Sequence, residues 1–166
     1  MSGHTLRLFP GRYAACRMDP QAAVPPWAEG GGFVSITRTP DELSIVCPED
    51  RIPATEDGER GWKCLQVVGP FAFEVIGVLA SLAGALAEAG VPILSVSTYE
   101  TDFLFVKDHD LGRASNALVQ AGHRVVEAGS CGKSEGSAGQ ADVPNASVLR
   151  RVLKVDQERT TWRCQE

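Results

Sequence analysis

An internal repeat constrains this chain more than any other feature of its sequence. Residues 34–50 align without a gap on residues 94–110, an offset of 60 positions. Ser35, Val46 and Asp50 fall on identical residues, and apolar residues meet apolar ones at 34/94, 36/96, 43/103 and 45/105. Matched alternation of this kind is typical of two copies of one supersecondary unit. The sequence therefore predicts a fold that uses the same unit twice.

Each copy has the pattern of a β-hairpin. In the first copy, residues 34–37 alternate as a half-buried strand does, Pro40 provides a turn, and residues 43–47 run back. In the second copy, residues 93–98 and 103–107 follow the same pattern. We therefore expect two antiparallel hairpins.

Strands and helices surround the second hairpin in a definite order. A strand at 64–68 comes first, and a helix follows whose apolar residues recur at i, i+3 and i+4. That apolar face consists of Val75, Ile76, Leu79, Leu82, Ala83 and Leu86. Gly90 ends this helix, and after the hairpin Asp108 or Asp110 can cap a second helix that leads to a strand at 123–127. Strand, helix, strand, strand, helix, strand is the ferredoxin-like split βαβ arrangement.

The first half carries the same plan in a shorter form. Strands are expected at 6–8 and 13–18, with a short helical turn at 25–27 before the hairpin. Residues 51–61 are too polar and too broken by Gly and Pro for a full helix. The predicted fold class is α+β, with tandem ferredoxin-like units of which the first is abbreviated.

We expect an abbreviated unit over residues 5–62, a complete unit over 63–128 and a tail over 129–166. The tail begins with a Gly- and Ser-rich stretch at 129–139, which is typical of a flexible linker. Beyond it, residues 146–157 can form only one short amphipathic helix, which is marginal in water by itself. The tail is therefore predicted to be flexible.

Charge and cysteine content narrow the function classes. The chain has 16 Lys and Arg against 21 Asp and Glu, a net charge of -5, which argues against a nucleic-acid partner. The uncharged run between Glu74 and Glu88 is too short to span a membrane, so no membrane partner is expected. The five cysteines lack C-x-x-C spacing, and no metal or other cofactor is predicted. Their odd number and the absence of a signal-peptide pattern predict a cytoplasmic location.

Catalytic motifs give little support to an enzyme. The patterns H-E-x-x-H and G-x-G-x-x-G are absent from the sequence. Cys64 and His123 are of the right types for a nucleophile and a base, but a lone Cys and a lone His on strands are usually structural. We therefore expect no enzymatic activity. A small enzyme would need a pocket that joins Cys64 or His123 to Asp102.

Several segments resemble a family of small proteins with tandem ACT domains. The segments are residues 33–44, 61–62, 69–73, 77–82 and 97–103. The resemblance covers residues 5–128, and more distantly the pattern is similar to the CASTOR-type cytosolic arginine sensors. It implies that an amino acid binds at an interface between ACT units, in the service of regulation rather than catalysis.

The resemblance also implies a set of ligand-binding residues. The ligand loop of the CASTOR-type sensors matches Ala72 to Val78, with Gly77 in register, although Ala72 stands where a glycine is expected. A second motif, Ser-Thr-aromatic-x-x-Asp, matches the segment from Ser97 to Asp102, and a strand of a partner ACT unit matches part of the first hairpin. The implied set is Ser44, Ile45, Ala72, Gly77, Val78, Thr98, Tyr99 and Asp102.

Elementary chemistry allows two interpretations of this set. The amides that open the helix after Gly77 could bind a carboxylate, and Asp102 could pair with an ammonium or guanidinium. Alternatively, Gly77 serves turn geometry and Asp102 caps its own backbone. The two function hypotheses are a homo-oligomeric regulatory amino-acid-binding protein that acts on an enzyme or a signalling protein, and a ligand-independent dimerisation or interaction module.

Overall fold

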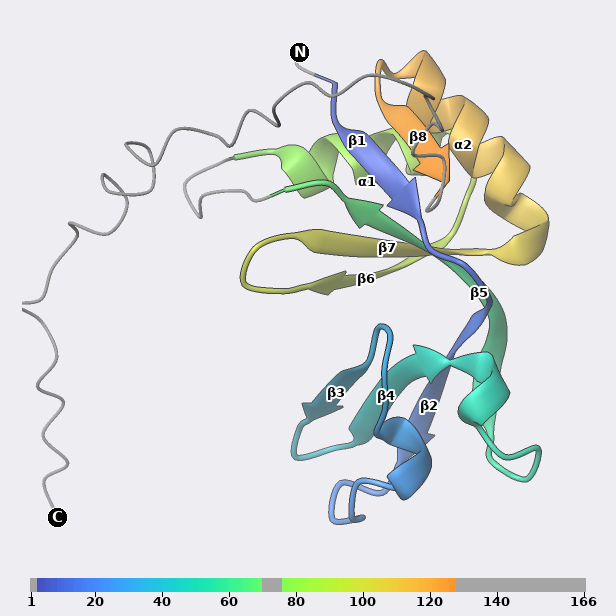
Figure 1. Ribbon diagram of the computed structural model, residues 1–166. Coiled ribbons are helices and arrows are strands. Elements are labelled where there is room, and N and C mark those ends of the chain that lie inside the picture. Colours follow the sequence, from blue (N-terminus) through green and yellow to red (C-terminus); the bar gives the residue numbers. More distant parts are fainter. Residues whose placement is uncertain (1–2, 70–75, 128–166) are drawn as a thin grey trace, which may run out of the picture. The chain divides into compact units, whose positions relative to one another are not determined.

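The computed structural model describes residues 3–69 and 76–127 (Figure 1). These residues form eight strands, two α-helices and three short 3₁₀ turns. The strands are β1 (Thr5–Leu8), β2 (Tyr13–Met18), β3 (Ser35–Arg38), β4 (Leu43–Pro48), β5 (Gly58–Val67), β6 (Ile93–Ser97), β7 (Asp102–Lys107) and β8 (Arg124–Glu127). The helices are α1 (Val78–Glu88) and α2 (Leu111–Gln120), and the 3₁₀ turns are Pro26–Ala28, Glu49–Arg51 and Asp108–Asp110. The predicted tail at 129–166 lies outside the described residues.

Strand β5 belongs to both halves of the sheet. Its first part pairs with β2, where Trp62 lies opposite Tyr13, and its later part pairs with β7 and β1. The sequence predicts this strand only from Cys64 onward, whereas the strand begins at Gly58. The polar residues at its start have low strand propensity, but pairing with β2 outweighs that propensity. One continuous strand therefore crosses the predicted boundary at 62/63, and the boundary itself stays a prediction.

The second half has the predicted order of elements, in β5, α1, β6, β7, α2 and β8. Both helices pack on one face of the sheet, where Leu82 and Leu118 are fully buried. They contact Leu65 of β5 and Leu104 of β7 in the same core. The α+β, ferredoxin-like prediction is confirmed.

The N-terminal strand occupies a place that the sequence does not predict. Strand β1 lies between β5 and β8, antiparallel to the first and parallel to the second (Figure 1). Leu6 is fully buried in the core beneath the helices, whereas the next residue, Arg7, is exposed. Strand β1 therefore separates the first and last strands of the second unit.

The first half is abbreviated, as predicted. Its strands follow the order β3, β4, β2, β5, and the described residues between them contain 3₁₀ turns but no α-helix. Pro25 and Pro26 open the 3₁₀ turn between β2 and β3 and remove two amide donors, which opposes a helix that extends further toward β2. Leu43 and Ile45 of β4 are fully buried, and Ala28 of the 3₁₀ turn packs on them.

The two hairpins are related by an offset of 59 positions, so the predicted offset of 60 is wrong by one residue. The N–H of Thr39 donates to the carbonyl of Glu42 at 2.8 Å, and that of Thr98 donates to Thr101 at 2.8 Å. A shift of one residue moves every side chain to the opposite face of a strand. The error arises because residues 103–106 are all buried, so apolar residues match at either offset.

Helix α1 begins later than the predicted pattern. Ile76, which was expected on the buried face, precedes the helix and is 96% exposed. Gly77 has a left-handed backbone, with φ of 88°, at the N-cap position, so the helical register starts only after it. The buried face consists of Val78, Leu82 and Leu86.

The cap predicted for the second helix has the expected position but a different bond. Asp110 occupies the N-cap position of α2, yet its side chain makes no capping hydrogen bond. Instead its carboxylate pairs with the guanidinium of Arg113. The carboxylate therefore stabilises the first turn through a side-chain pair at i, i+3.

Candidate functional site

The turn between β6 and β7 brings three of the predicted site residues together. Thr98 donates its hydroxyl to the carbonyl of Thr101 at 2.9 Å, and Tyr99 is 80% exposed. Asp102 begins β7, and its Oδ1 accepts the hydroxyl of Ser97 at 2.5 Å. Thr98 and Asp102 thus already hold the turn together.

Two further predicted residues lie at the beginning of α1. Gly77 is exposed, and a Cβ there would meet nothing within 4 Å, whereas Val78 is 7% exposed and belongs to the core. Both border a hollow of about 580 Å³ that also includes His4 and His123. Ala72 lies outside the described residues.

The remaining predicted pair lies on β4 in the first half. Ser44 is half-buried opposite Arg17 and Thr37, and Ile45 is fully buried in the first-half core. The structure therefore distributes the predicted residues over three places: the β6–β7 turn, the beginning of α1, and β4.

A hollow of about 180 Å³ opens beside the β6–β7 turn, and we call it the turn hollow. Its lining consists of Arg7, Gln66, Val68, Gly69, Glu100 and Thr101. Strand pairing places Arg7 of β1 opposite Gln66 of β5. The hydroxyl of Thr101 donates to the carbonyl of Val67, which ties the turn to the end of β5. The turn hollow is thus built by three chain segments.

The turn hollow combines charges of opposite sign. Arg7 and Glu100 are both exposed at its lining. A guanidinium pairs well with a carboxylate, and a carboxylate accepts hydrogen bonds from an ammonium group. The volume of the turn hollow is below the roughly 300–1,000 Å³ of sites for drug-sized molecules. Its chemistry therefore suits a single small zwitterion.

Neither charged residue of the turn hollow is predicted from the sequence. Arg7 reaches it only because β1 is inserted beside β5, and a strand of four residues has too little periodicity to reveal its neighbours. Glu100 lies within the predicted segment from Thr98 to Asp102, where the sequence pattern predicts only a turn. The feature of the sequence that could have indicated Glu100 as a binding residue is a carboxylate at the tip of a turn.

Cys64 cannot act as the nucleophile of a small enzyme. It is fully buried within an aromatic cluster, and burial raises the pKa of its thiol to about 12. The reactive thiolate is therefore scarce near neutral pH. His123 accepts the backbone N–H of His4 on Nδ1 at 3.1 Å, and burial, with the nearby His4 as a smaller cause, lowers its pKa. Cys64 and His123, the pair that the alternative of a small enzyme would use, thus lack an accessible nucleophile.

Comparison with known proteins places the chain in a family. A family model of the ACT domain matches residues 57–120, and another, described only as an N-terminal domain, matches residues 11–55. The X-ray structure of protein Atu0741 from Agobacterium tumefaciens has 42% sequence identity and a TM-score of 0.73, over 77% of this chain and 96% of that chain. The chain contains an ACT domain over residues 57–120. The ACT match covers β5 to α2, which are the shared strand and most of the second half.

Curated relatives of this ACT protein include the cytosolic arginine sensor for mTORC1 subunit 1. The Bos taurus and Homo sapiens proteins are each 31% identical over 99 residues, which are 53% of this chain and 30% of theirs. The chain therefore spans less than a third of the length of these curated relatives.

A more distant structure shows the same fold. Protein VC0802 from Vibrio cholerae, of unknown function and described as a possible transport protein, has a TM-score of 0.59 and 21% identity, over 72% of this chain and 90% of that chain. In the part of this ACT protein that the structure describes, neither helix has the length and apolar character to cross a membrane.

Proposed function

We propose that this ACT protein is a regulatory, non-catalytic amino-acid-binding protein of the cytoplasm, and that the turn hollow binds the amino acid. The observation that carries the proposal is the presence of Arg7 and Glu100 at one small hollow beside the ACT turn. Arg7 binds the α-carboxylate of the ligand, and Glu100 accepts hydrogen bonds from its α-ammonium. The similarity to a protein named as an arginine sensor supports an amino acid as the ligand class.

The predicted ligand residues differ in how close they lie to the turn hollow, and so in the role that we propose for them. Thr98, Tyr99 and Asp102 are close in sequence to Glu100 and Thr101 of the turn hollow, and their contact with the ligand stays a prediction. Gly77, Val78, Ser44 and Ile45 lie elsewhere in the described chain, so their contribution stays a prediction that requires a second subunit of a homo-oligomer. A bound amino acid would then change the contacts between ACT units and so regulate an enzyme or a signalling protein.

A thermal-shift screen of the full chain against the twenty amino acids tests the proposal. At a ligand concentration of 100 times Kd, binding stabilises the folded state by roughly 2.7 kcal/mol, which raises Tm by several degrees. Arg7→Gln and Glu100→Gln should each raise the Kd of the amino acid about 10- to 150-fold, because each removes a charged hydrogen-bond partner. The Tm shift at a fixed ligand concentration should shrink accordingly. Asp102→Asn should do the same only if Asp102 contacts the ligand.

Matched variants separate binding from general charge effects. Arg124→Gln and Glu29→Gln change exposed side chains outside the turn hollow and should respond as the wild type does. A chain that shows no shift with any amino acid at millimolar concentration would overturn the proposal. If that chain is also a stable oligomer whose mass ignores amino acids, the interaction-module alternative is correct.

A further inference from the structure

The hollow of about 580 Å³ beside Gly77 follows helix α1 along its whole length, and we call it the α1 groove. Its lining repeats every three or four residues along one stripe of the helix surface, as neighbours on a helix do. The residues of this stripe are Gly77, Ala80, Ser81, Gly84, Ala85 and Glu88. Ala121 after α2 also contributes to the lining. The eleven residues of α1 extend about 16 Å, so the α1 groove is as long as a helix of this size.

The outward side of α1 is unusual for a helix at a protein surface. Ala80 and Gly84 are exposed, and Glu88 is the single charged residue of the helix. Helix α2 packs on the same face of the sheet but exposes polar side chains such as Arg113 and Gln120. A surface helix normally has one polar face, whereas a helix that is apolar on all sides is buried. We therefore expect the outward side of α1 to contact another apolar surface.

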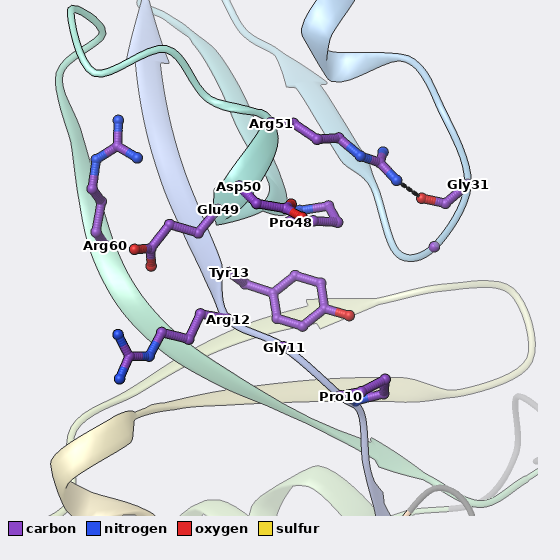
Figure 2. A pocket seen from close by; sticks show the side chains of 11 residues that line it. Pro10, Gly11, Arg12, Tyr13, Gly31, Pro48, Glu49, Asp50, Arg51 and Arg60 are labelled. Atoms are coloured by element: carbon purple, nitrogen blue, oxygen red, sulfur yellow. Dashed lines mark hydrogen bonds between the residues drawn. The ribbon is translucent and has the colours of Figure 1, made fainter.

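A pocket of about 640 Å³ at the start of β2 provides a contrast (Figure 2). Arg12 at its lining pairs with Asp108 at 2.7 Å, and the other lining charges are two arginines and two carboxylates. Figure 2 shows that Arg51 donates a hydrogen bond to the carbonyl of Gly31. The charges of this pocket are thus balanced within the chain. The α1 groove, in contrast, has one carboxylate and no Lys or Arg at its lining.

The two ends of α1 have complementary charges. At its beginning, the N-cap residue Gly77 has no side chain to accept a hydrogen bond, and the first turn contains no acidic residue. The first amides therefore lack a carboxylate, which the positive end of the helix dipole favours. At the other end, Glu88 is exposed and forms none of the ion pairs within residues 3–69 and 76–127. Its carboxylate lies at the negative end of the dipole, where it is disfavoured.

A second copy of the chain in the antiparallel orientation satisfies both ends of α1 at once. Two-fold symmetry places Glu88 at the beginning of the partner helix and Glu88 of the partner subunit at Gly77. The middle of this contact falls near Ala80 and Gly84, whose small size allows the two helix axes to approach within the usual distance of roughly 8–10 Å or less. We propose that the chain forms a two-fold symmetric dimer in which the two α1 helices pack antiparallel through the α1 groove.

Ile76 fits the same arrangement. Its side chain is 96% exposed directly before α1, at the beginning of the groove. The antiparallel orientation brings it to the other end of the α1 groove in the second copy, where Ala85 and Ala121 form an apolar lining. Burial of a large apolar side chain favours association. The groove and its occupant are therefore supplied by one and the same surface, as a two-fold interface requires.

Sedimentation equilibrium of the full chain at low ionic strength tests this proposal over a range of protein concentrations. The wild type should show a saturable monomer–dimer equilibrium. Gly84→Arg should raise the Kd of the dimer about 10- to 100-fold, because a long side chain prevents close packing of the two helices. This variant should fold, because a Cβ at Gly84 meets nothing within 4 Å and Arg favours a helix more than Gly does.

Gly112→Arg is the matched control. Gly112 is also an exposed glycine of a helix, and a Cβ there also meets nothing within 4 Å, but it lies on α2 and does not line the α1 groove. The variant adds the same side chain and charge, so it should dimerise as the wild type does. A wild type that stays monomeric up to millimolar concentration, or equal effects of Gly84→Arg and Gly112→Arg, would overturn the proposal.

Glu88→Gln tests the antiparallel orientation. The variant removes two symmetric contacts between a carboxylate and a helix N-terminus, so it should raise the Kd of the dimer about 3- to 30-fold. The difference from the wild type should shrink in high salt, and Glu29→Gln, outside the groove, should have no effect. An unchanged Kd for Glu88→Gln would overturn this orientation.

The dimer is independent of the proposed amino-acid site, because no residue of the turn hollow lines the α1 groove. Arg7→Gln should therefore lose the response to amino acids and keep the Kd of the dimer. Gly84→Arg should lose the dimer and keep Arg7 and Glu100 in place at the turn hollow. Failure of the dimer proposal is thus distinguishable from failure of the amino-acid proposal.

Discussion

The two halves of the sheet contain the same hairpin but differ in what covers it. In the second half, α1 and α2 close the core over β1, β5 and β7 (Figure 1). In the first half, a 3₁₀ turn and irregular segments cover β4 and β2. The connecting sequences explain the difference: residues 78–88 are mostly Ala and Leu, which favour a helix, whereas Pro25, Pro26 and the glycines at 30–32 oppose one. The hairpin residues therefore determine the strands, and the connecting residues determine whether helices or irregular segments cover them.

The difference in cover should affect how each core responds to a lost side chain. Two packed helices hold the walls of a cavity apart, because interiors are close-packed and relax only partly. An irregular cover can move into the vacated space more easily. We therefore expect equal truncations in the two hairpins to have unequal costs.

Ile45→Ala and Leu104→Ala form a matched pair that tests this expectation. Both residues are fully buried, and both occupy the same hairpin position at the offset of 59. Each truncation removes the same number of carbons and should cost about 2–5 kcal/mol of unfolding free energy. Leu104→Ala should fall at the upper end and Ile45→Ala at the lower end. Urea unfolding measures both, and an equal or larger loss for Ile45→Ala would contradict the comparison.

The second hairpin and its helices could be predicted from sequence because their patterns are local. The α1 stripe with Leu82 and Leu86, and the glycines that end both helices, need no knowledge of distant contacts. The register of the repeat was harder to predict, because β7 is buried on both faces over residues 103–106 and the polar Ser44 of β4 meets an apolar residue at either offset, Phe103 or Leu104. The local sequence pattern therefore predicts the strands and helices, but it does not predict the offset that relates the two hairpins.

The candidate site was less predictable, because it depends on contacts between segments far apart in the sequence. Arg7 joins the turn hollow through the insertion of β1 beside β5, and Gln66 reaches the turn hollow because β5 pairs with β1 in this register. Both facts result from strand pairing, which residue types at these positions do not reveal. Thr98 and Asp102 lie at one turn, as the sequence predicts, because that segment is local, whereas their role in binding stays a prediction.

Lowering the pH should reduce the free energy of unfolding through the second half, which contains His123. Residues 13–62 of the first half contain no histidine. Burial lowers the pKa of His123, so the unfolded chain binds a proton more readily than the folded one. Its stabilising contribution is complete above the ordinary pKa of about 6.5 and is lost as the pH falls below that value. Protonation of Nδ1 also removes the acceptor of the His4 N–H, a loss of about 1–3 kcal/mol.

Unfolding free energies at pH 7.5 and pH 5.5 measure this effect. The wild type should be less stable at pH 5.5, and His123→Gln should show a smaller dependence on pH. The exposed His109, whose Nε2 lies 3.4 Å from Oδ2 of Asp110, provides the control, because His109→Gln should leave the loss at acid pH in place. If His123→Gln keeps the full pH dependence, the acid sensitivity comes from other groups.

The smallest expected difference between the halves concerns the two hairpin turns. Thr39 accepts the N–H groups of Asp41 at 3.2 Å and Glu42 at 3.1 Å, whereas Thr98 donates one hydrogen bond of 2.9 Å to Thr101. A net hydrogen bond contributes roughly 0.5–1.5 kcal/mol, and these exposed bonds belong at the lower end. Thr39→Ala should therefore cost about 1 kcal/mol and Thr98→Ala about 0.5 kcal/mol, while Thr→Ser at either position should restore most of the loss. Urea midpoints at constant m-value resolve this difference. A larger loss for Thr98→Ala would mean that the second turn stabilises its half through contacts beyond its own backbone.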